Sequence, residues 1–555
     1  MKVLVATYPY AGHFNPTQPV VVELVRRGHE VVWLTGPAYE ARVRQTGARF
    51  VAMSADALID DANIHRMHGK ITLAKVADYL RRLFVDRIPA QIQDYRAVID
   101  GTVQAGMGAE DGEDKLKPKH GFAADVLVVE FCTFAARCFH DLTGLPYATL
   151  GINPLVTLDP EIPPWGSGEQ PPRTWVRRLR NRVRHQLGIV FFVSRLSAAL
   201  NQQRRRLGLP PRSRWRSYAD DVRSPDLHLQ MTTPAFELPR KRLPPAVRFV
   251  GPLLPAWMDG EPSPPVPVIT DDAAQKEADT TTDTTAAAAI GTAATIDAID
   301  ATKVWPTPLW WDEMLAHPRE RVVHLTQGTI AVNTDLLVKP TILALAHRDD
   351  LLVIVTGKNA DALFLDAAAP ATSEGAVPAD AATARAGTPK IPRPANVRTA
   401  PFVPHLRLLP HVGVMVTNAG YNGVLAALSC GVPLVCAGRS EDKADVSSRV
   451  AWSGAGIDLG TSTPTVAAVR EAVLHVTASG DPHGYRRAAA RIQADFAAHN
   501  GPVEAVDALE ELVREKKKEV EEKAKNRVTT KANTNKSRKL KPKPAKLRPS
   551  SWISD

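Results

Sequence analysis

Two blocks of the chain alternate short, wholly apolar runs with helical patterns, and this alternation constrains the fold more than any other feature. The apolar runs are 2–7, 30–35, 124–131 and 145–150 in the first block, and 321–326, 351–356, 412–416 and 433–437 in the second. Helical patterns such as 16–27 and 133–142 separate them. A strand, a helix and a further strand joined by short loops form a right-handed parallel unit. Each block therefore predicts an open, doubly wound α/β sheet.

A chain of 555 residues is longer than one ordinary domain, and the two blocks divide it. The expected units are a first Rossmann-like domain (1–245), a linker (246–303), a second Rossmann-like domain (304–480), C-terminal helices for which a return to the first domain is one arrangement (481–514), and a basic disordered tail (515–555). The linker contains a stretch rich in Asp, Thr, Ala and Pro at 259–303, which is too polar and repetitive for a core. Similar insertions at 104–120 and 367–390 also predict mobile loops.

The net charge of +10 belongs to the C-terminal tail and not to the body of the protein. Residues 514–555 contain 15 Lys and Arg but 5 Asp and Glu, so the remaining residues are neutral overall. A neutral body argues against nucleic acid or another polyanion as a partner. The tail begins as a charged helix continuation and then becomes rich in Lys, Pro, Ser and Thr. This composition predicts disorder, with binding of an anionic partner and nuclear import as the alternatives.

The four cysteines lie inside apolar runs without a C-x-x-C spacing, which predicts reduced, buried thiols. The N-terminus has one Lys and a short apolar stretch that leads into a polar loop, so no signal peptide is expected. The most apolar long window, 187–200, is interrupted by Ser194 and Arg195 and is too short to span a membrane. These features predict a soluble, cytoplasmic protein.

His13 stands directly behind the first apolar run, between a glycine and an Asn-Pro helix start. A lone histidine in such a loop more often packs or caps than catalyses. However, ligands of open α/β sheets bind beyond the carboxyl ends of the strands. Glu130 follows another apolar run, where a carboxylate usually caps the next helix. If the two strands are near neighbours, Glu130 is also where a partner for His13 would lie.

The second block carries candidate anion-binding loops, although no G-x-G-x-x-G dinucleotide motif occurs. Thr329 closes a Thr-Gln-Gly-Thr sequence after the first strand of this block, and its hydroxyl suits a phosphate oxygen. Gly420 and Gly423 stand where the strand 412–416 passes into the next helix, so backbone N–H groups are open at a helix N-terminus. Asp442 and Lys443 follow the next strand, where they can bind sugar hydroxyl groups beside the phosphate site.

Taken together, these loops resemble the donor-binding signature of the UDP-glycosyltransferases, which are inverting enzymes of GT-B fold. The matching elements are Phe402-Val403-Pro404-His405, Asn418-Ala419-Gly420-Tyr421-Asn422-Gly423, Gly431-Val432-Pro433, Asp442-Lys443, and the GHFNP loop at 12–16. The resemblance spans roughly residues 1–510 and is weak across 160–300. It implies two Rossmann-like domains that face a central cleft. It also implies a hexosyltransferase that moves a sugar from a nucleotide diphosphate, expected to be UDP, to a hydroxyl of a small, largely apolar acceptor.

The resemblance assigns roles residue by residue. His13 would be the general base and Glu130 would orient it. The donor would be held by Thr329, Phe402, Val403, His405, Asn418, Gly420, Tyr421, Asn422, Gly423, Asp442 and Lys443. No metal ion or other cofactor is expected, because the diphosphate is stabilised by helix-end N–H groups and hydroxyls.

Several positions depart from the common pattern of the family. Asn418 replaces a phosphate-binding His, Gly423 replaces Ser, Lys443 replaces Gln, and Glu130 stands where Asp is usual. These variants are similar to the bacterial and fungal macrolide-type branch. They leave the sugar open and suggest two rivals, a nucleotide-sugar-binding protein with impaired turnover and another GT-B enzyme such as a UDP-sugar epimerase. The presence of both His13 and Glu130 argues against the first rival, and the opening histidine loop argues against the second.

The region expected to bind the acceptor combines Trp165, Trp175, Phe191 and Phe192 with a series of arginines. A core helix with a solvated face is the plain interpretation of this composition. An apolar acceptor cleft, or peripheral contact of 173–200 with a membrane, are the alternatives. The pattern contains no signal for an oligomeric state.

Overall fold

The computed structural model describes residues 1–58, 73–102, 121–254, 307–328, 333–357, 360–365 and 390–539. Side chains are described from Lys75 onward in the helix that begins at Leu73, and as far as Asn526 in the last helix. Thr329 and the insertions predicted at 104–120, 259–303 and 367–390, Lys390 excepted, lie outside the described residues.

The N-terminal half is built on a seven-stranded parallel sheet in the order β3-β2-β1-β4-β5-β6-β7. The strands are β1 (Lys2–Ala6), β2 (Glu30–Thr35), β3 (Arg49–Ala52), β4 (Val126–Glu130), β5 (Tyr147–Gly151), β6 (Leu227–Gln230) and β7 (Val247–Phe249). Side chains of β1 alternate between two apolar layers. Val3 and Val5 belong to one core, and Leu4 and Ala6 belong to the core on the other face of the sheet. Burial on both faces explains why these strands read as unbroken apolar runs.

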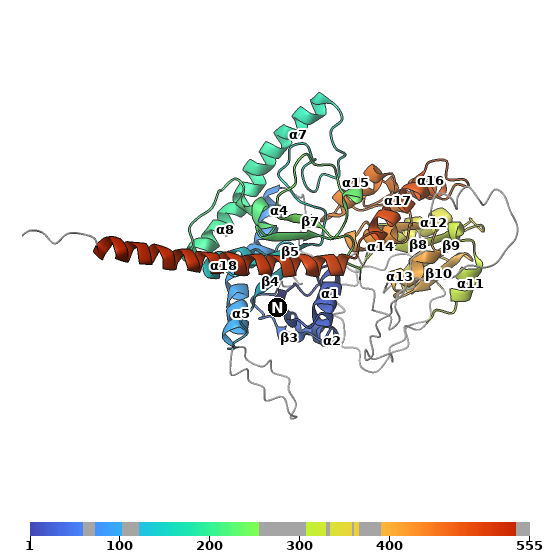
Figure 1. Ribbon diagram of the computed structural model, residues 1–555. Helices are drawn as coiled ribbons and strands as arrows, with labels where there is room; N and C mark the ends of the chain where they lie inside the picture. Colours follow the sequence, from blue (N-terminus) through green and yellow to red (C-terminus); the bar gives the residue numbers. More distant parts are fainter. Residues whose placement is uncertain are drawn as a thin grey trace, which may run out of the picture.

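Helices cover both faces of this sheet (Figure 1). They are α1 (Ala11–Arg26), α2 (Glu40–Gln45), α4 (Leu73–Leu80), α5 (Ile88–Asp100), α6 (Phe134–Thr143), α7 (Trp175–Gly188), α8 (Ser194–Arg206) and α9 (Ser217–Asp221), with short turns η1 (Pro37–Tyr39), η2 (Arg81–Val85), η3 (Ile189–Val193) and η4 (Pro234–Phe236). The segments η2 and η3 are single π-helical turns. Through η3, helix α7 continues into α8 without a break.

The C-terminal half repeats the design with six parallel strands in the order β10-β9-β8-β11-β12-β13. The strands are β8 (Val322–Thr326), β9 (Leu352–Thr356), β10 (Val397–Ala400), β11 (Val414–Thr417), β12 (Leu434–Cys436) and β13 (Gly456–Asp458). The helices and turns are α11 (Trp311–Ala316), η5 (Arg319–Arg321), α12 (Val338–Leu345), η6 (Asp361–Leu363), α13 (His405–Leu408), η8 (Leu409–His411), α14 (Tyr421–Ser429), α15 (Lys443–Ser453), α16 (Val466–Val476), α17 (Tyr485–Ala497) and α18 (Gly501–Lys539). In each sheet the strand order reverses beside the first strand, at β1/β4 and β8/β11, and such reversal points are where ligands of this architecture bind.

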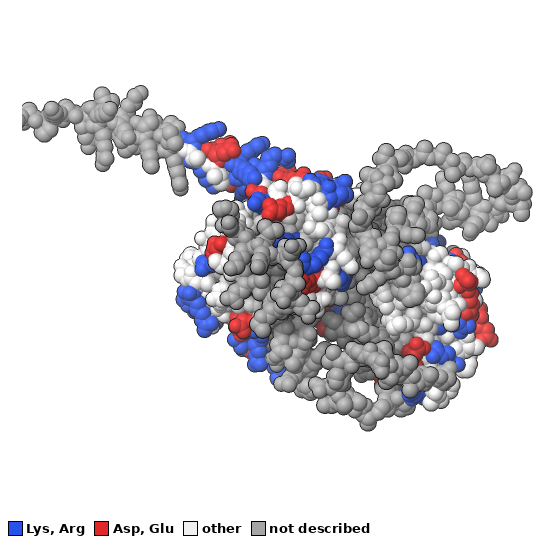
Figure 2. Space-filling view, turned by 90° about the horizontal axis from the view of Figure 1, so that it is seen from below, with Lys and Arg blue, Asp and Glu red and all other residues white. Residues whose placement is uncertain are grey.

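Helix α18 crosses from the second half to the first and lies along it (Figure 1). Its apolar face buries Leu509 and Leu512 against the core beside α1. Arg27, the C-cap residue of α1, pairs with Asp507 at 2.6 Å, and His29 contacts Glu510 at 2.8 Å. Beyond that contact, Lys, Arg and Glu side chains line the exposed part of the helix (Figure 2).

The strands and helices that were expected from apolar runs are present, and three boundaries differ. Helix α1 begins at Ala11, so His13 lies in its first turn and not in a loop before it. Strand β7 belongs to the first sheet although it lies beyond residue 245. The backbone of α18 is helical to Lys539, so the helix continuation expected at the start of the tail is longer than its charged stretch, and the disorder expected of the tail is wrong up to that residue. Glu and Lys side chains with helical spacing, such as Glu519 and Lys523, support this extension.

All four cysteines are buried and unpaired. Within the described part of the chain, no helix is long and apolar enough to cross a membrane.

Candidate active site

His13 and Glu130 meet at the reversal point of the first sheet. Strands β1 and β4 are parallel neighbours with Ala6 opposite Val129, so the segments that come after them lie side by side. His13 Nδ1 is 3.1 Å from Glu130 Oε2. The pair is within ion-pair distance, but its geometry does not meet that of an aligned hydrogen bond.

Glu130 is fixed by its surroundings. Its side chain is fully buried, and the backbone N–H of Tyr8 donates to its second oxygen, Oε1, at 3.2 Å. Burial and the charge of Glu130 both raise the pKa of the Tyr8 phenol well above its usual value, so Tyr8 stays neutral. Glu130 thus has one oxygen held by backbone and the other turned to His13.

The electrostatics of His13 involve both halves of the protein. Burial lowers the pKa of the imidazole, but the charges of Glu130 and Asp442 outweigh burial, and the pKa of His13 is raised. Asp442 belongs to the C-terminal half, and the side-chain amide of Asn422 from the same half donates to the Gly12 carbonyl at 3.2 Å, so the two halves approach each other beside His13. Tyr8 and Tyr10 contact the imidazole at ring-centroid distances of 6.0 and 5.9 Å, which gives it an aromatic surrounding.

The facing loops of the C-terminal half come after β8 and β11, which are also parallel neighbours. The side-chain amide of Asn418 donates to the backbone carbonyl of Gln327 at 2.5 Å and so joins the two loops. Gly328 and Ala419 both adopt positive φ, at 76° and 64°. For Ala419 this conformation is strained, and such strain tends to collect at binding sites.

Helix α14 begins directly after these loops. Gly420 is its N-cap residue, and a Cβ at this position would have no atom of the described residues within 4 Å, so the N-terminus of α14 is open on that side as far as the described residues show. Gly423 lies against Met415 and His405. Asn422 donates its side-chain amide to the carbonyl of Gly12 at 3.2 Å, beside His13.

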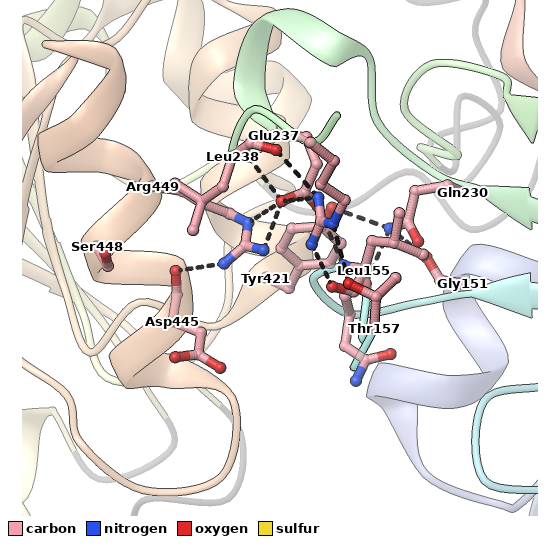
Figure 3. A network of polar contacts seen from close by, with 12 residues as sticks. Gly151, Leu155, Thr157, Gln230, Glu237, Leu238, Tyr421, Asp445, Ser448 and Arg449 are labelled. Carbon is pink, nitrogen blue, oxygen red and sulfur yellow. Dashed lines mark hydrogen bonds and ion pairs between the residues drawn. The ribbon is translucent and has the colours of Figure 1, made fainter. Parts of the chain in front are cut away.

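Tyr421 points elsewhere. Its ring is buried, and its hydroxyl accepts a hydrogen bond from Gln230 of β6 at 3.3 Å (Figure 3). The structure therefore places Tyr421 in a contact between the two halves and away from the open N-terminus of α14.

The segment 402–405 lies at the start of α13. The Phe402 side chain is half exposed, whereas Val403 is buried in the core. Burial lowers the pKa of His405 to about 4, so this imidazole is neutral near pH 7. Its Nδ1 has no hydrogen-bond partner among the described residues, and its ring meets that of His324 edge-on at 5.4 Å.

Asp442 immediately precedes α15 and lies within electrostatic reach of His13. Burial raises its pKa to about 6. Lys443 forms an ion pair with Glu441, so its charge is partly neutralised. Of the predicted site residues that the structure describes, Asn422 and Asp442 thus approach His13 from the other half, Asn418 and Gly420 lie in the loop before α14, and Val403 and Tyr421 are buried in packing.

Comparison with known proteins agrees with this architecture. Residues 363–512 match the family model described as "Erythromycin biosynthesis protein CIII-like, C-terminal domain". The 4'-demethylrebeccamycin synthase of Lentzea aerocolonigenes is 35% identical over 512 residues, which make up 92% of this chain and 99% of that protein. UDP-glycosyltransferase 2 of Phaeomoniella chlamydospora is 27% identical, over 92% of this chain and 95% of that protein. The chain belongs to the UDP-glycosyltransferase family.

Solved structures identify the fold of this glycosyltransferase as GT-B. The glycotransferase of kitacinnamycin aligns with a TM-score of 0.56 at 18% identity, over 92% of this chain and 98% of that one. The calicheamicin glycosyltransferase CalG4 aligns with the same TM-score at 17% identity, over 92% and 98%. At these identities the likeness concerns the fold alone.

Sequence reasoning missed the polar residues that hold the two halves of the glycosyltransferase together. Arg449 of α15 is buried and pairs with Glu237 of the first half at 2.5 Å (Figure 3). Glu237 also pairs with Arg240, three residues later in the chain. Asp445, one turn earlier, accepts the backbone N–H groups of Gly166 and Gly168 at 2.7 and 3.1 Å. We call Glu237, Arg240, Asp445 and Arg449 the interdomain network. Each partner lies more than 200 residues from its counterpart across the interface, so no local pattern could reveal the contact.

Proposed function

We propose that this glycosyltransferase moves a sugar from a nucleotide diphosphate donor, expected to be a UDP-sugar, to a hydroxyl of a small, largely apolar acceptor, with inversion at the anomeric carbon. The observation that carries the proposal is the His13–Glu130 pair at the reversal point of the first sheet, 3.1 Å apart and facing Asn422 and Asp442. A structural histidine would need neither a fully buried carboxylate nor the opposing loops.

In the proposed reaction, Nε2 of His13 accepts the proton of the acceptor hydroxyl while that oxygen bonds to the anomeric carbon. The bond from this carbon to the diphosphate oxygen breaks on the opposite face, and the diphosphate leaves with the electron pair. Glu130 then stabilises the imidazolium ion through Nδ1, as the carboxylate does in other histidine-based sites.

The departing diphosphate would be stabilised at the N-terminus of α14. The backbone N–H groups from Gly420 to Gly423 point out of this helix end, where the helix dipole favours negative charge. The hydroxyl of Thr329 is proposed as a further donor. Phe402 and Val403 would lie near the nucleotide base, with His405 near the ribose, and Asp442 and Lys443 would bind the sugar.

Two observations support a small, apolar acceptor. Tyr8 and Tyr10 surround the imidazole, and Phe84 meets the ring of Tyr8 edge-on at 5.5 Å. Several relatives are also named as enzymes of antibiotic biosynthesis. The expectation that no metal ion takes part remains a prediction.

The test is to incubate the purified protein with UDP- and dTDP-sugars and to measure slow hydrolysis of the donor, and then transfer to a panel of aromatic alcohols. We expect one nucleotide class to be hydrolysed and the product to have the anomeric configuration opposite to that of the donor. Tight binding of the nucleotide without hydrolysis or transfer would instead identify a binding protein. Retention of configuration would contradict the single displacement.

A further inference from the structure

Helix α7 is amphipathic in the opposite sense to an ordinary surface helix. Its inner side is polar: the amide of Asn181 donates to the carbonyls of Pro160 and Ile162 at 2.6 and 2.9 Å, and His185 contacts the Ile162 carbonyl at 2.7 Å. The opposite side is apolar and faces solvent. It consists of Trp175, Val176, Leu179, Val183, Leu187 and Val190, whose side chains are 45–74% exposed.

These six residues form one continuous surface, which we call the α7 stripe. Successive residues of a helix are about 100° apart around its axis, so a step of four residues turns about 40° past a full circle. Leu179, Val183 and Leu187 therefore lie close together on one side of the helix, and Val190 has an angular position between those of Leu179 and Val183. The stripe lies about half a turn away from Asn181 and His185. Helix α7 projects from the N-terminal half (Figure 1), and the segment just before it contacts the C-terminal half, where the Glu169 carbonyl accepts the Ser448 hydroxyl at 2.8 Å and Arg173 lies over the Trp452 ring.

Arginines flank the α7 stripe on both sides. On the helical wheel Arg178 and Arg182 lie along one edge, and Arg177, Arg180 and Arg184 lie along the other. No Asp or Glu occurs between Pro171 and Leu200. From outside the helix, Glu169 pairs with Arg180 and Arg184, and Glu161 contacts Arg182 at 3.5 Å. Five arginines thus face two carboxylates, and the surface remains positive.

The charge pattern selects among the partners that could cover such a stripe. A second copy of the chain, packed stripe to stripe, would bring arginine edges against arginine edges, and like charges repel at that distance. A membrane with anionic lipids meets both requirements at once, because apolar side chains enter the acyl region while flanking arginines reach the phosphates. Arg177 and Arg180 also line a polar hollow of about 270 Å³ beside the helix, together with Glu169 and Gln170.

We propose that the α7 stripe binds the surface of anionic membranes. The binding is peripheral, with α7 lying in the plane of the interface, and it is independent of the reaction proposed for the cleft.

The experiment is co-sedimentation of the full-length protein with vesicles of phosphatidylcholine, with and without phosphatidylglycerol. The test variant is Leu179→Ser/Val183→Ser/Leu187→Ser. The matched control is Leu309→Ser/Leu315→Ser/Leu343→Ser, which changes three exposed leucines of the C-terminal half. We expect the wild type and the control to bind the mixed vesicles, and the test variant to bind about tenfold or more weakly, because three apolar insertions are lost. Both variants should keep the wild-type thermal melt, since the substituted side chains are exposed.

Two further variants distinguish binding through the arginines beside the α7 stripe from binding through the basic C-terminal tail. Arg178→Gln/Arg182→Gln should reduce the preference for phosphatidylglycerol, and deletion of 516–555 should leave binding unchanged. Equal binding by the wild type and the test variant, absence of binding by the wild type, or loss of binding only on deletion of the basic tail would each overturn the proposal. A wild-type dimer that becomes a monomer in the test variant, measured by sedimentation velocity without lipid, would instead make the stripe an interface between copies.

Discussion

Pro16 has a direct consequence for the residue four positions before it. A proline inside a helix has no N–H, so the carbonyl at position i−4 loses its usual partner. In α1 that carbonyl belongs to Gly12, and it accepts the side-chain amide of Asn422 from the other half at 3.2 Å. Pro16 thus leaves the Gly12 carbonyl, next to His13, without a partner inside the helix, and Asn422 of the other half donates a hydrogen bond to it.

His13→Ala is predicted to reduce glycoside formation by about 10² to 10⁴, because the proton acceptor is lost. The affinity for the nucleotide-sugar should change little, since the proposed donor site lies in the other half. Glu130→Gln should cost less, because Oε1 can still accept the N–H of Tyr8 and only the charge is removed. Product formation and calorimetric donor binding, measured on the same preparations, provide the check. Wild-type turnover of His13→Ala would mean that the residue only packs.

The pH dependence of kcat/KM should follow the raised pKa of His13. The imidazole must be neutral to accept a proton, so the rate falls as the pH drops through this pKa. Burial lowers the pKa, and the charges of Glu130 and Asp442 raise it to a greater extent. Removing either charge, as in Glu130→Gln or Asp442→Asn, should move the acid limb to lower pH. A limb that stays in place or moves to higher pH in both variants would exclude His13 as the titrating base.

Asp442→Ala is predicted to lower kcat/KM for the sugar donor without unfolding the protein. Lost hydrogen bonds to sugar hydroxyls are worth about 1 to 3 kcal/mol, which corresponds to a clear rise in KM or fall in kcat. Glu441→Ala offers a neighbouring control, because Glu441 is largely exposed and pairs with Lys443. Equal kinetics for both variants would remove Asp442 from the sugar site.

For single residues, the sequence predicted which residues belong to the candidate site but not where their side chains point. His13 and Glu130 could be paired because both stand at the carboxyl ends of buried strands, and these strands were expected to be parallel. Tyr421 could not be placed, because its ring turns toward Gln230, a partner that the sequence separates from it by 191 residues. Asn418 was expected to help hold the donor, and one of the two N–H groups of its side-chain amide binds the carbonyl of Gln327, a contact that the sequence did not indicate.

Among the secondary-structure elements, α15 connects the proposed sugar site to the first half. It begins directly after Asp442, and its next turns carry Asp445 and Arg449, which contact the first half. The Arg449 and Arg240 guanidinium groups lower the pKa of the buried Glu237 despite its burial. The interdomain network therefore sets the position of α15 relative to His13.

Arg449→Met should destabilise the protein by about 3 kcal/mol, because Glu237 is left buried with one of its two cations removed. The matched control is Arg44→Met, since Arg44 forms an exposed pair with Glu40 at 2.8 Å whose loss costs about 1 kcal/mol or less. Urea unfolding measures both. The donor KM of Arg449→Met should also rise, because α15 carries Asp442 away from the cleft. A difference of less than about 1 kcal/mol between the variants would show that the network contributes no more than a surface pair.

Elements were predictable where burial left a strong local signal. Strand β4 is apolar throughout its length until Glu130 and was found. The edge strand β3 and the three-residue strands β7 and β13 are short and partly exposed, so their sequences contain little pattern. Strand β6 is fully buried but was missed, because His228 and Gln230 are polar and their partners come from elsewhere in the fold.

For the whole molecule, the first part of α18 is expected to be needed for stability, and the rest of the C-terminus is expected to be dispensable. Among the described side chains, its buried apolar residues end at Val513. The later turns of the helix contact the body through ion pairs of the half-exposed Lys516 with Asp226 and of the exposed Lys517 with Asp125. Deletion of 516–555 should therefore lower stability by about 1 kcal/mol or less per pair.

Deletion of 501–555 should have a much larger effect. It exposes the core around Leu509 and Leu512, and each such side chain contributes about 1.5 to 3 kcal/mol on burial. We expect the shorter deletion to melt like the full chain and the longer one to melt at a clearly lower temperature or to precipitate. Coincident thermal melts of the two truncations would contradict a structural role for the buried part of α18.

The return of α18 also decides how hybrid enzymes can be assembled from this chain. A recombinant that exchanges the C-terminal half at a single junction in the 255–306 segment would bring in a foreign last helix. That helix would meet Arg27 and His29 without the matching carboxylates of Asp507 and Glu510. A second junction near residue 500 keeps α18 with the surface on which it packs. The unit of exchange for donor specificity is therefore an internal cassette, not the C-terminal half of the gene.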